Sequence, residues 1–144
     1  MDTSIESVLD QKGRTVFSIQ LGKSVYEAIA EMDSRNVGAL IVMDEHEVVG
    51  IITERDYLRK VILKGRSSKD TPVATIMSRN LVSLTPQDSV LHAMALMTAK
   101  RCRHLPVLKN GQLDGIVSVG DLVKAIIAEQ QFKIQMLENY ISAR

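Results

Sequence analysis

Cysteine, aromatic residues and long hydrophobic runs are all scarce in this chain of 144 residues. Its one cysteine, Cys102, has no partner for an internal disulfide, and the N-terminal residues lack the pattern of a secretory signal peptide. The longest apolar runs, such as residues 39–43 and 48–52, are far shorter than the ~20 residues of a membrane-spanning helix. These absences predict a cytoplasmic protein that does not enter the membrane.

An excess of charge of one sign is also missing. Lys and Arg number 18 and Asp and Glu number 17, so the net charge of +1 provides no general attraction for nucleic acid or an anionic membrane. Aromatic residues make up 3% of the chain and Trp is absent, which leaves few surfaces on which bases could stack. We therefore expect no nucleic-acid or membrane partner, and any anion must bind through a local cluster of groups.

What the chain does contain is an internal repeat at a constant offset. Residues 24–32, SVYEAIAEM, match residues 89–97, SVLHAMALM, and 89 − 24 = 65. Residues 50–56, GIITERD, match residues 115–121, GIVSVGD, at the same offset of 65. Two blocks in one register are not expected by chance, so we infer that the chain contains two copies of one unit.

Each copy is predicted to have the element order β-α-β-β-α. The first copy is expected to have strands over residues 15–19, 39–43 and 48–52, and the second over 81–84, 104–108 and 113–117. Apolar residues at helical spacing predict a helix over 25–32 and another over 90–97. Ser24 and Glu27 form a capping-box pattern, and Asn110-Gly111 indicates a hairpin turn.

One such unit is too small to close a core alone. We therefore predict an α+β fold in which the two repeats pack through their sheets, with pseudo-twofold symmetry and two equivalent clefts. The predicted boundaries are 1–64 for the first repeat with the N-terminal segment, 65–79 for a basic, serine-containing linker, and 80–144 for the second repeat with a C-terminal helix.

The repeated pattern Gly-x-x-Thr/Ser-x-x-Asp is expected where a strand runs directly into a helix. Thr53 and Ser118 are predicted N-caps, and Asp56 and Asp121 fall at the third helical position. The free amides of a helix start stabilise a phosphate, and a carboxylate beside them can accept hydrogen bonds from a ribose diol. The same spacing also forms a capping box that needs no ligand, so the pattern alone leaves both interpretations open.

The doubled pattern resembles the paired CBS domains of Bateman modules, in particular the small stand-alone bacterial type. The resemblance covers residues 16–122 and is carried by residues 38–42, GALIV, with 50–56, and by residues 103–107, RHLPV, with 115–121. It implies a regulatory module without catalytic activity that binds an adenosine-containing nucleotide such as AMP, ATP or NAD. It also implies that Asp56 and Asp121 hold the ribose, helped by Thr53 and Ser118. The adenine-pocket candidates that it implies are Val16, Phe17, Gly38, Ala39, Leu81, Val82 and Pro106.

The two sites are not expected to be identical. Arg103 and His104 in the second copy replace Gly38 and Ala39 in the first, whereas Arg55 is replaced by Gly120. The predicted phosphate contacts are Arg55, Arg66, Lys69, Arg103 and His104. The alternatives are a solvated charge for Arg103, a structural histidine for His104, and a flexible basic linker for the segment with Arg66 and Lys69.

The sequence contains no recognised pattern of a catalytic or metal-binding site. His92, Cys102 and His104 lack the spacing of a metal site, and no Gly-Lys-Ser/Thr triplet completes a phosphate-binding loop around Gly65. Ser118 has no His and acid placed in sequence to activate it. We therefore expect no catalytic residue, no metal and no catalytic cofactor.

The C-terminal segment has an apolar stripe. Ile127, Ile134 and Ile141 recur every seven residues, with Leu137 between them and Gln130 as an interruption. Too few heptads are present for a long coiled coil, so we expect the stripe to cover a neighbouring surface, and we predict a homodimer. The competing functional hypothesis is a structural dimerisation or adaptor module without a physiological ligand; in either case the sequence does not identify the partner protein.

Overall fold

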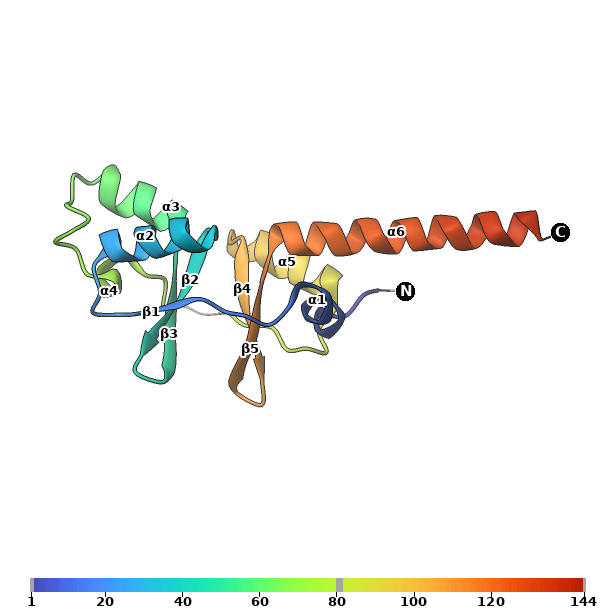
Figure 1. Ribbon diagram of the computed structural model, residues 1–144, viewed down its shortest axis with the longest axis horizontal. Coiled ribbons are helices and arrows are strands. Elements are labelled where there is room, and N and C mark those ends of the chain that lie inside the picture. Colours follow the sequence, from blue (N-terminus) through green and yellow to red (C-terminus); the bar gives the residue numbers. More distant parts are fainter. Residues whose placement is uncertain (1, 80–81, 144) are drawn as a thin grey trace. The chain divides into compact units, whose positions relative to one another are not determined.

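The computed structural model describes residues 2–79 and 82–143. The chain forms two compact units, which we describe separately (Figure 1). The first-repeat unit is Thr15–Val82, and the second-repeat unit combines Met1–Arg14 with Ser83–Arg144. The N-terminal segment therefore belongs with the second repeat, whereas the sequence placed it with the first.

The first-repeat unit has a three-stranded sheet in the order β1-β2-β3. Strand β1 (Ser18–Gln20) is parallel to β2 (Ala39–Asp44), which forms an antiparallel hairpin with β3 (Glu47–Thr53). Helix α2 (Val25–Arg35) packs Val25, Ala28 and Met32 against Leu40, Val42 and Ile52 of the sheet. Helix α3 (Glu54–Tyr57) continues into a π-helical segment, η1 (Leu58–Ile62), and α4 (Val73–Ile76) completes the core.

The second-repeat unit has the hairpin β4 (His104–Lys109) and β5 (Gln112–Ser118), followed by the long helix α6 (Val119–Ser142). Helices α5 (Val90–Lys100) and α1 (Ile5–Lys12) complete this unit. Four elements of this unit begin 65 residues after their counterparts in the first repeat. The counterparts are α2 and α5 (25 and 90), β2 and β4 (39 and 104), β3 and β5 (47 and 112), and α3 and α6 (54 and 119). The predicted helices and hairpins are confirmed at these positions.

The first strand predicted for the second repeat is reduced to a single bridge. Leu81 lies outside the described residues, and over 82–84 the pairing is an isolated parallel bridge between Leu84 and Val107. In the first repeat, the N–H of Ile41 donates to the carbonyl of Phe17 at 3.1 Å. The equivalent of Ile41 is Pro106, which has no N–H, so this ladder bond cannot form in the second repeat.

The helix that precedes each repeat in sequence packs with the other repeat's elements. Helix α1 precedes the first repeat but belongs to the second-repeat unit, where the N–H of Val90 donates to the carbonyl of Thr3 at 2.8 Å. Helix α4 precedes the second repeat but belongs to the first-repeat unit, where the N–H of Val25 donates to the carbonyl of Thr71 at 2.8 Å. Each unit thus depends on a segment from outside its own repeat.

Residues 65–79, predicted as a linker, are therefore largely built into the first-repeat unit. Val73 and Ile76 are fully buried, and the Thr71 hydroxyl donates to the carbonyl of Ser67 at 2.6 Å. Residues 73–76 of this segment form α4, whose apolar side chains help to close the core of the first-repeat unit.

Candidate functional site

Both repeats place a carboxylate at the point where a strand becomes a helix. In the first-repeat unit, the N–H of Thr53 donates to Asp56 Oδ2 at 3.0 Å, and the N–H of Asp56 donates to Thr53 Oγ1 at 3.2 Å. In the second-repeat unit, the N–H of Ser118 donates to Asp121 Oδ2 at 2.8 Å, and the N–H of Asp121 donates to Ser118 Oγ at 3.2 Å. Both capping boxes are therefore formed, and each holds its carboxylate at the helix start.

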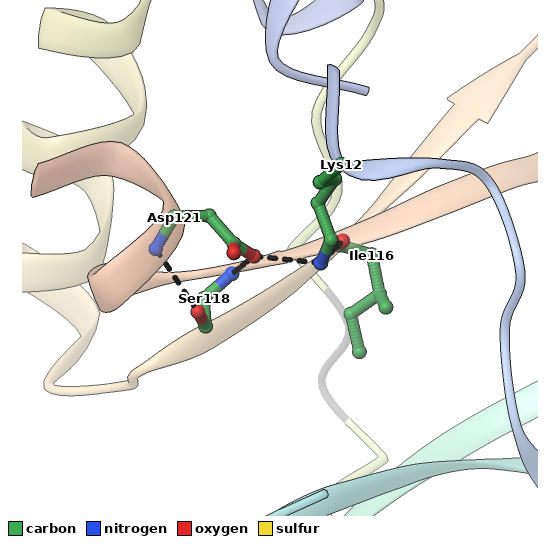
Figure 2. A network of polar contacts seen from close by, with 4 residues as sticks. All are labelled: Lys12, Ile116, Ser118 and Asp121. Atoms are coloured by element: carbon green, nitrogen blue, oxygen red, sulfur yellow. Dashed lines mark hydrogen bonds and ion pairs between the residues drawn. The ribbon is translucent and has the colours of Figure 1, made fainter. Parts of the chain in front are cut away.

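A lysine from another element also holds Asp121 (Figure 2). Lys12, the last residue of α1, donates from Nζ to Asp121 Oδ2 at 2.6 Å and to the carbonyl of Ile116 at 2.8 Å. The Asp121 side chain is 18% exposed and that of Lys12 is 31% exposed, so the pair is partly shielded from water. The carboxylate is thus held both by its own helix start and by α1.

These contacts change the acidity of Asp121. Burial by itself raises the pKa of this carboxyl group, but hydrogen bonds from Lys12 and Ser118, with the positive charge of Lys12, more than offset burial. The net result is a pKa below the usual value of an aspartate. Asp121 is therefore ionised at neutral pH and available only as a hydrogen-bond acceptor.

Asp56 has a lysine as well, but from its own helical segment. Lys60 Nζ lies 3.1 Å from Asp56 Oδ1 and donates to the carbonyl of Ile76 at 2.9 Å. The Lys60 side chain is more exposed than that of Lys12. The sequence analysis missed both lysines, although the i,i+4 spacing of Asp56 and Lys60 could have indicated the pair in the first repeat.

The start of β2 lies beside the capping box of the first repeat, and the start of β4 lies beside that of the second. The N–H of Glu54 donates to the carbonyl of Gly38 at 3.1 Å, and the N–H of Val119 donates to the carbonyl of Arg103 at 2.9 Å. Ala39 pairs with Thr53 in the sheet and His104 pairs with Ser118. The structure thus brings Gly38 and Ala39 next to Thr53 in the first-repeat unit. It brings Arg103 and His104 next to Ser118 in the second-repeat unit.

The other predicted adenine-pocket residues are more dispersed. Val16 and Phe17 are half-buried before β1, and the Phe17 ring lies under the Arg35 guanidinium at 4.9 Å. Pro106 is buried in β4, where its carbonyl accepts the N–H of Leu84. Val82 is half-buried at the end of the first-repeat unit, and Leu81 lies outside the described residues.

The predicted phosphate contacts are mostly exposed. Arg55, Arg66, Lys69 and Arg103 are exposed, while His104 is half-buried. The Lys69 ammonium lies 5.0 Å from the centre of the Tyr26 ring on α2. In the described part of the first-repeat unit, the ion pair of Asp56 is made by Lys60 and not by Arg66 or Lys69.

A groove of about 480 Å³ lies between α2 and α3 in the first-repeat unit. Of the predicted site residues, Gly38 lines it, together with apolar residues such as Met32 and Tyr57. Asp33 and Glu54 also line the groove, and their carboxylates disfavour an anionic ligand there. The groove is thus a poor match for a phosphate-bearing nucleotide.

Burial raises the pKa of the Cys102 thiol, so the thiolate needed for nucleophilic chemistry is disfavoured.

Within residues 2–79 and 82–143, no group of three or more His, Cys, Asp and Glu side chains could hold a metal ion. In the same residues, no helix is both long and apolar enough to cross a membrane.

Comparison with known proteins gives consistent matches over both repeats. The model of the CBS domain family matches residues 13–63 and 73–128. The chain is 44% identical to the CBS domain-containing protein CBSX3, mitochondrial, of Arabidopsis thaliana, over 96% of this chain and 72% of that protein. It is 35% identical to the CBS domain-containing protein YhcV of Bacillus subtilis, over 82% of this chain and 84% of that protein.

A solved structure matches equally well. A candidate signal-transduction protein with CBS domains from Burkholderia ambifaria is 46% identical and superposes with a TM-score of 0.86. The match covers 89% of this chain and 96% of that chain.

Proposed function

Because this chain belongs to the CBS domain family, we propose that it is a regulatory module without catalytic activity that binds an adenosine-containing nucleotide such as AMP, ATP or NAD. The predicted resemblance to a tandem CBS protein and the α+β class with two β-α-β-β-α-like repeats are both confirmed. The observation that carries the proposal is the repeated carboxylate: Asp56 and Asp121 occupy the same place at the start of a helix, 65 residues apart.

The chemistry of these carboxylates suits a ribose. Each is partly buried, and its position is fixed by a backbone N–H of its own capping box; the Thr53 hydroxyl also donates to Asp56. A carboxylate that is already fixed and partly shielded from water can accept hydrogen bonds from two neighbouring hydroxyl groups with little further loss of conformational entropy. We assign ribose binding to Asp56 and Asp121, with Thr53 and Ser118 beside them.

The remaining assignments are proposals of the same kind. Phosphate contacts are assigned to Arg55, Arg66, Lys69, Arg103 and His104, and the adenine pocket to Val16, Phe17, Gly38, Ala39, Leu81, Val82 and Pro106. Since Gly38 and Ala39 correspond to Arg103 and His104, the two sites should differ in affinity for anionic ligands.

The structural adaptor remains the second candidate function, and one observation favours it. Both carboxylates already have hydrogen-bond partners from their helix starts and an ion pair from a lysine. These contacts account for the aspartates without any ligand. An adaptor of this kind would contribute only its shape and its dimerisation surface.

Nucleotides released from the purified protein, identified by mass spectrometry, provide the first test. Calorimetric titration with AMP, ADP, ATP, NAD and S-adenosylmethionine then measures affinity and stoichiometry. Asp56→Asn and Asp121→Asn keep a capping oxygen but lose the charge, so each variant should fold and should bind at one site about tenfold to a hundredfold more weakly.

The matched control is Asp88→Ala, which removes a hydrogen bond that the N–H of Thr85 donates to a carboxylate in a turn. We expect this variant to keep wild-type affinity. A wild-type protein that releases no nucleotide and binds none of the five ligands would favour the adaptor. Loss of stability in both Asn variants without loss of affinity would assign the aspartates to capping alone.

We also propose that the module forms a homodimer and signals to another protein by a change of shape. The predicted cytoplasmic location stays a prediction, and the name of the Arabidopsis relative assigns that protein to the mitochondrion.

A further inference from the structure

Helix α6 continues well beyond the part that packs in the second-repeat unit (Figure 1). Leu122 is fully buried, Ala125 and Ile126 are half-buried, and every described residue from 130 to 143 is exposed. This exposed end of α6 nevertheless carries large apolar side chains: Phe132, Ile134, Met136, Leu137, Tyr140 and Ile141. An exposed apolar surface of this size is removed from water only when another surface covers it.

A heptad stripe runs along α6 and onto this exposed end, and we call it the tail stripe. It consists of Val123, Ile127, Gln130, Ile134, Leu137 and Ile141, at alternating spacings of four and three residues. At about 100° per residue, the tail stripe faces roughly a quarter turn away from the face that buries Leu122 and Ile126. It is therefore not a continuation of the contact that α6 makes within its own unit.

We propose that the tail stripe pairs in parallel with the tail stripe of a second copy of this chain. Ile127, Ile134 and Ile141 occupy the first position of each heptad and Leu137 the fourth, a combination that favours two parallel strands. The pairing identifies a surface of the proposed homodimer and does not depend on nucleotide binding.

The charges that flank the tail stripe fit this arrangement. Lys133 directly precedes a first-position residue and Glu138 directly follows a fourth-position residue, five residues later. In a parallel pair, these two positions face each other across the interface, so Lys133 of one copy lies beside Glu138 of the other. In an antiparallel pair, each Lys133 faces another Lys133 if the helices overlap fully.

A second copy suits the tail stripe better than a membrane surface does. Helix α6 carries two basic residues, Lys124 and Lys133, and three acidic ones, Asp121, Glu129 and Glu138, so it lacks the basic polar face that binds anionic lipid. A short tail stripe is sufficient for pairing, because α6 is already helical before two copies meet. The Ser118 capping box and the buried Leu122 anchor its start.

The first test compares two neighbouring apolar residues of the full chain. Ile134 lies in the tail stripe and Met136 does not, yet their side chains are 54% and 55% exposed. We expect Ile134→Asp to raise the dimer dissociation constant at least tenfold in sedimentation equilibrium, and Met136→Asp to leave it near the wild-type value. Circular dichroism should show that both variants keep the wild-type fold.

The outcomes separate this inference from the proposed function. A wild-type chain that stays monomeric at all concentrations would overturn both the tail pairing and the homodimer. A dimer that survives Ile134→Asp, or dissociates with Met136→Asp instead, would overturn the tail pairing and leave the homodimer standing. Nucleotide affinity of Ile134→Asp serves as an independent readout of the binding sites.

The parallel direction has its own test through the charges. Lys133→Glu places two acidic residues opposite each other and should weaken the dimer severalfold at low salt. The double variant Lys133→Glu with Glu138→Lys restores opposite charges in a parallel pair and should recover wild-type association. Failure of the double variant to recover would overturn the parallel arrangement.

Discussion

Asp56 and Asp121 have equivalent positions but are held by lysines of different origin. Lys60 lies on the same helical segment as Asp56, four residues later, whereas Lys12 reaches Asp121 from α1. A ligand that needs Asp121 therefore competes with a contact that ties α1 to its unit. A ligand that needs Asp56 disturbs only a local pair.

The Lys12 contact predicts a pH-dependent stability. The lowered pKa of Asp121 means that its ionised form stabilises the native state above the unfolded pKa, and that this contribution is lost as pH falls through the folded pKa. Lys12→Met should therefore lower the free energy of unfolding by about 1 kcal/mol at neutral pH and by less in acid. Urea unfolding at neutral and acidic pH measures this difference.

Lys60→Met is the matched control, because Lys60 makes the same two kinds of contact from a more exposed position. A loss of about 0.3–0.5 kcal/mol is expected for it at neutral pH. Equal losses for the two variants at every pH would contradict the special role of Lys12. Carboxyl-carbon NMR titration should also show the pKa of Asp121 rising in Lys12→Met.

Gly50 is required by close packing against the backbone. A Cβ atom at this position would lie 2.8 Å from the carbonyl oxygen of Ser78, whereas one at Gly115 would meet the flexible end of Leu9 at 2.7 Å. We expect Gly50→Ala to cost about 1–3 kcal/mol in free energy of unfolding, and Gly115→Ala to cost less.

Gly22→Ala is the control for this pair, since nothing lies within 4 Å of a Cβ atom there. Its effect should stay within about 0.5 kcal/mol. Thermal unfolding of the three variants ranks them, and a Gly115→Ala that is more destabilised than Gly50→Ala would show that Leu9 cannot move.

At the scale of elements, the repeat made the helices and hairpins predictable. Periodic apolar positions, the Ser24 cap and the Asn110-Gly111 turn are local signals, and each element appears where they indicated. Over the described residues 82–84 the predicted strand is reduced to one bridge, because Pro106 has no N–H for the cross-strand hydrogen bond that Ile41 makes in the first repeat. Aligning the two copies would have shown that Pro106 replaces Ile41, a donor in the first repeat.

The packing of α1 and α4 could not be predicted in the same way. Their contacts join residues far apart in sequence, such as Lys12 and Asp121, which are separated by 109 positions. The candidate site was predictable only as far as its capping boxes, because their residues are three positions apart. The lysine from α1 has no local signal.

Helix α1 should therefore be essential to the second-repeat unit. Leu9 is fully buried and contacts Gly115 of β5, so Leu9→Ala should lower the free energy of unfolding by about 2–5 kcal/mol. Hydrogen exchange should show the loss first in amides of β4 and β5. Asp10→Ala, an exposed change on the same helix, should leave exchange nearly unchanged; equal exchange in both variants would contradict this role of α1.

At the scale of the whole molecule, ligand binding and dimerisation act on stability through different variables. A ligand that binds only the native state raises the free energy of unfolding with its own concentration, by about 2.7 kcal/mol at a hundredfold excess over Kd. Dimerisation raises it with protein concentration instead. The two proposals can therefore be separated in a single set of melting curves.

We expect the Tm of the wild-type chain to rise with protein concentration, and that of Ile134→Asp to be independent of it. A bound nucleotide should raise the Tm of both chains, because neither aspartate is part of the tail stripe: Asp56 lies on α3 and Asp121 at the start of α6. Conversely, Asp56→Asn with Asp121→Asn should strongly reduce the rise of Tm at a given nucleotide concentration and keep the rise with protein concentration. If the double Asn variant lost both effects together, binding and assembly would have to share one structural change.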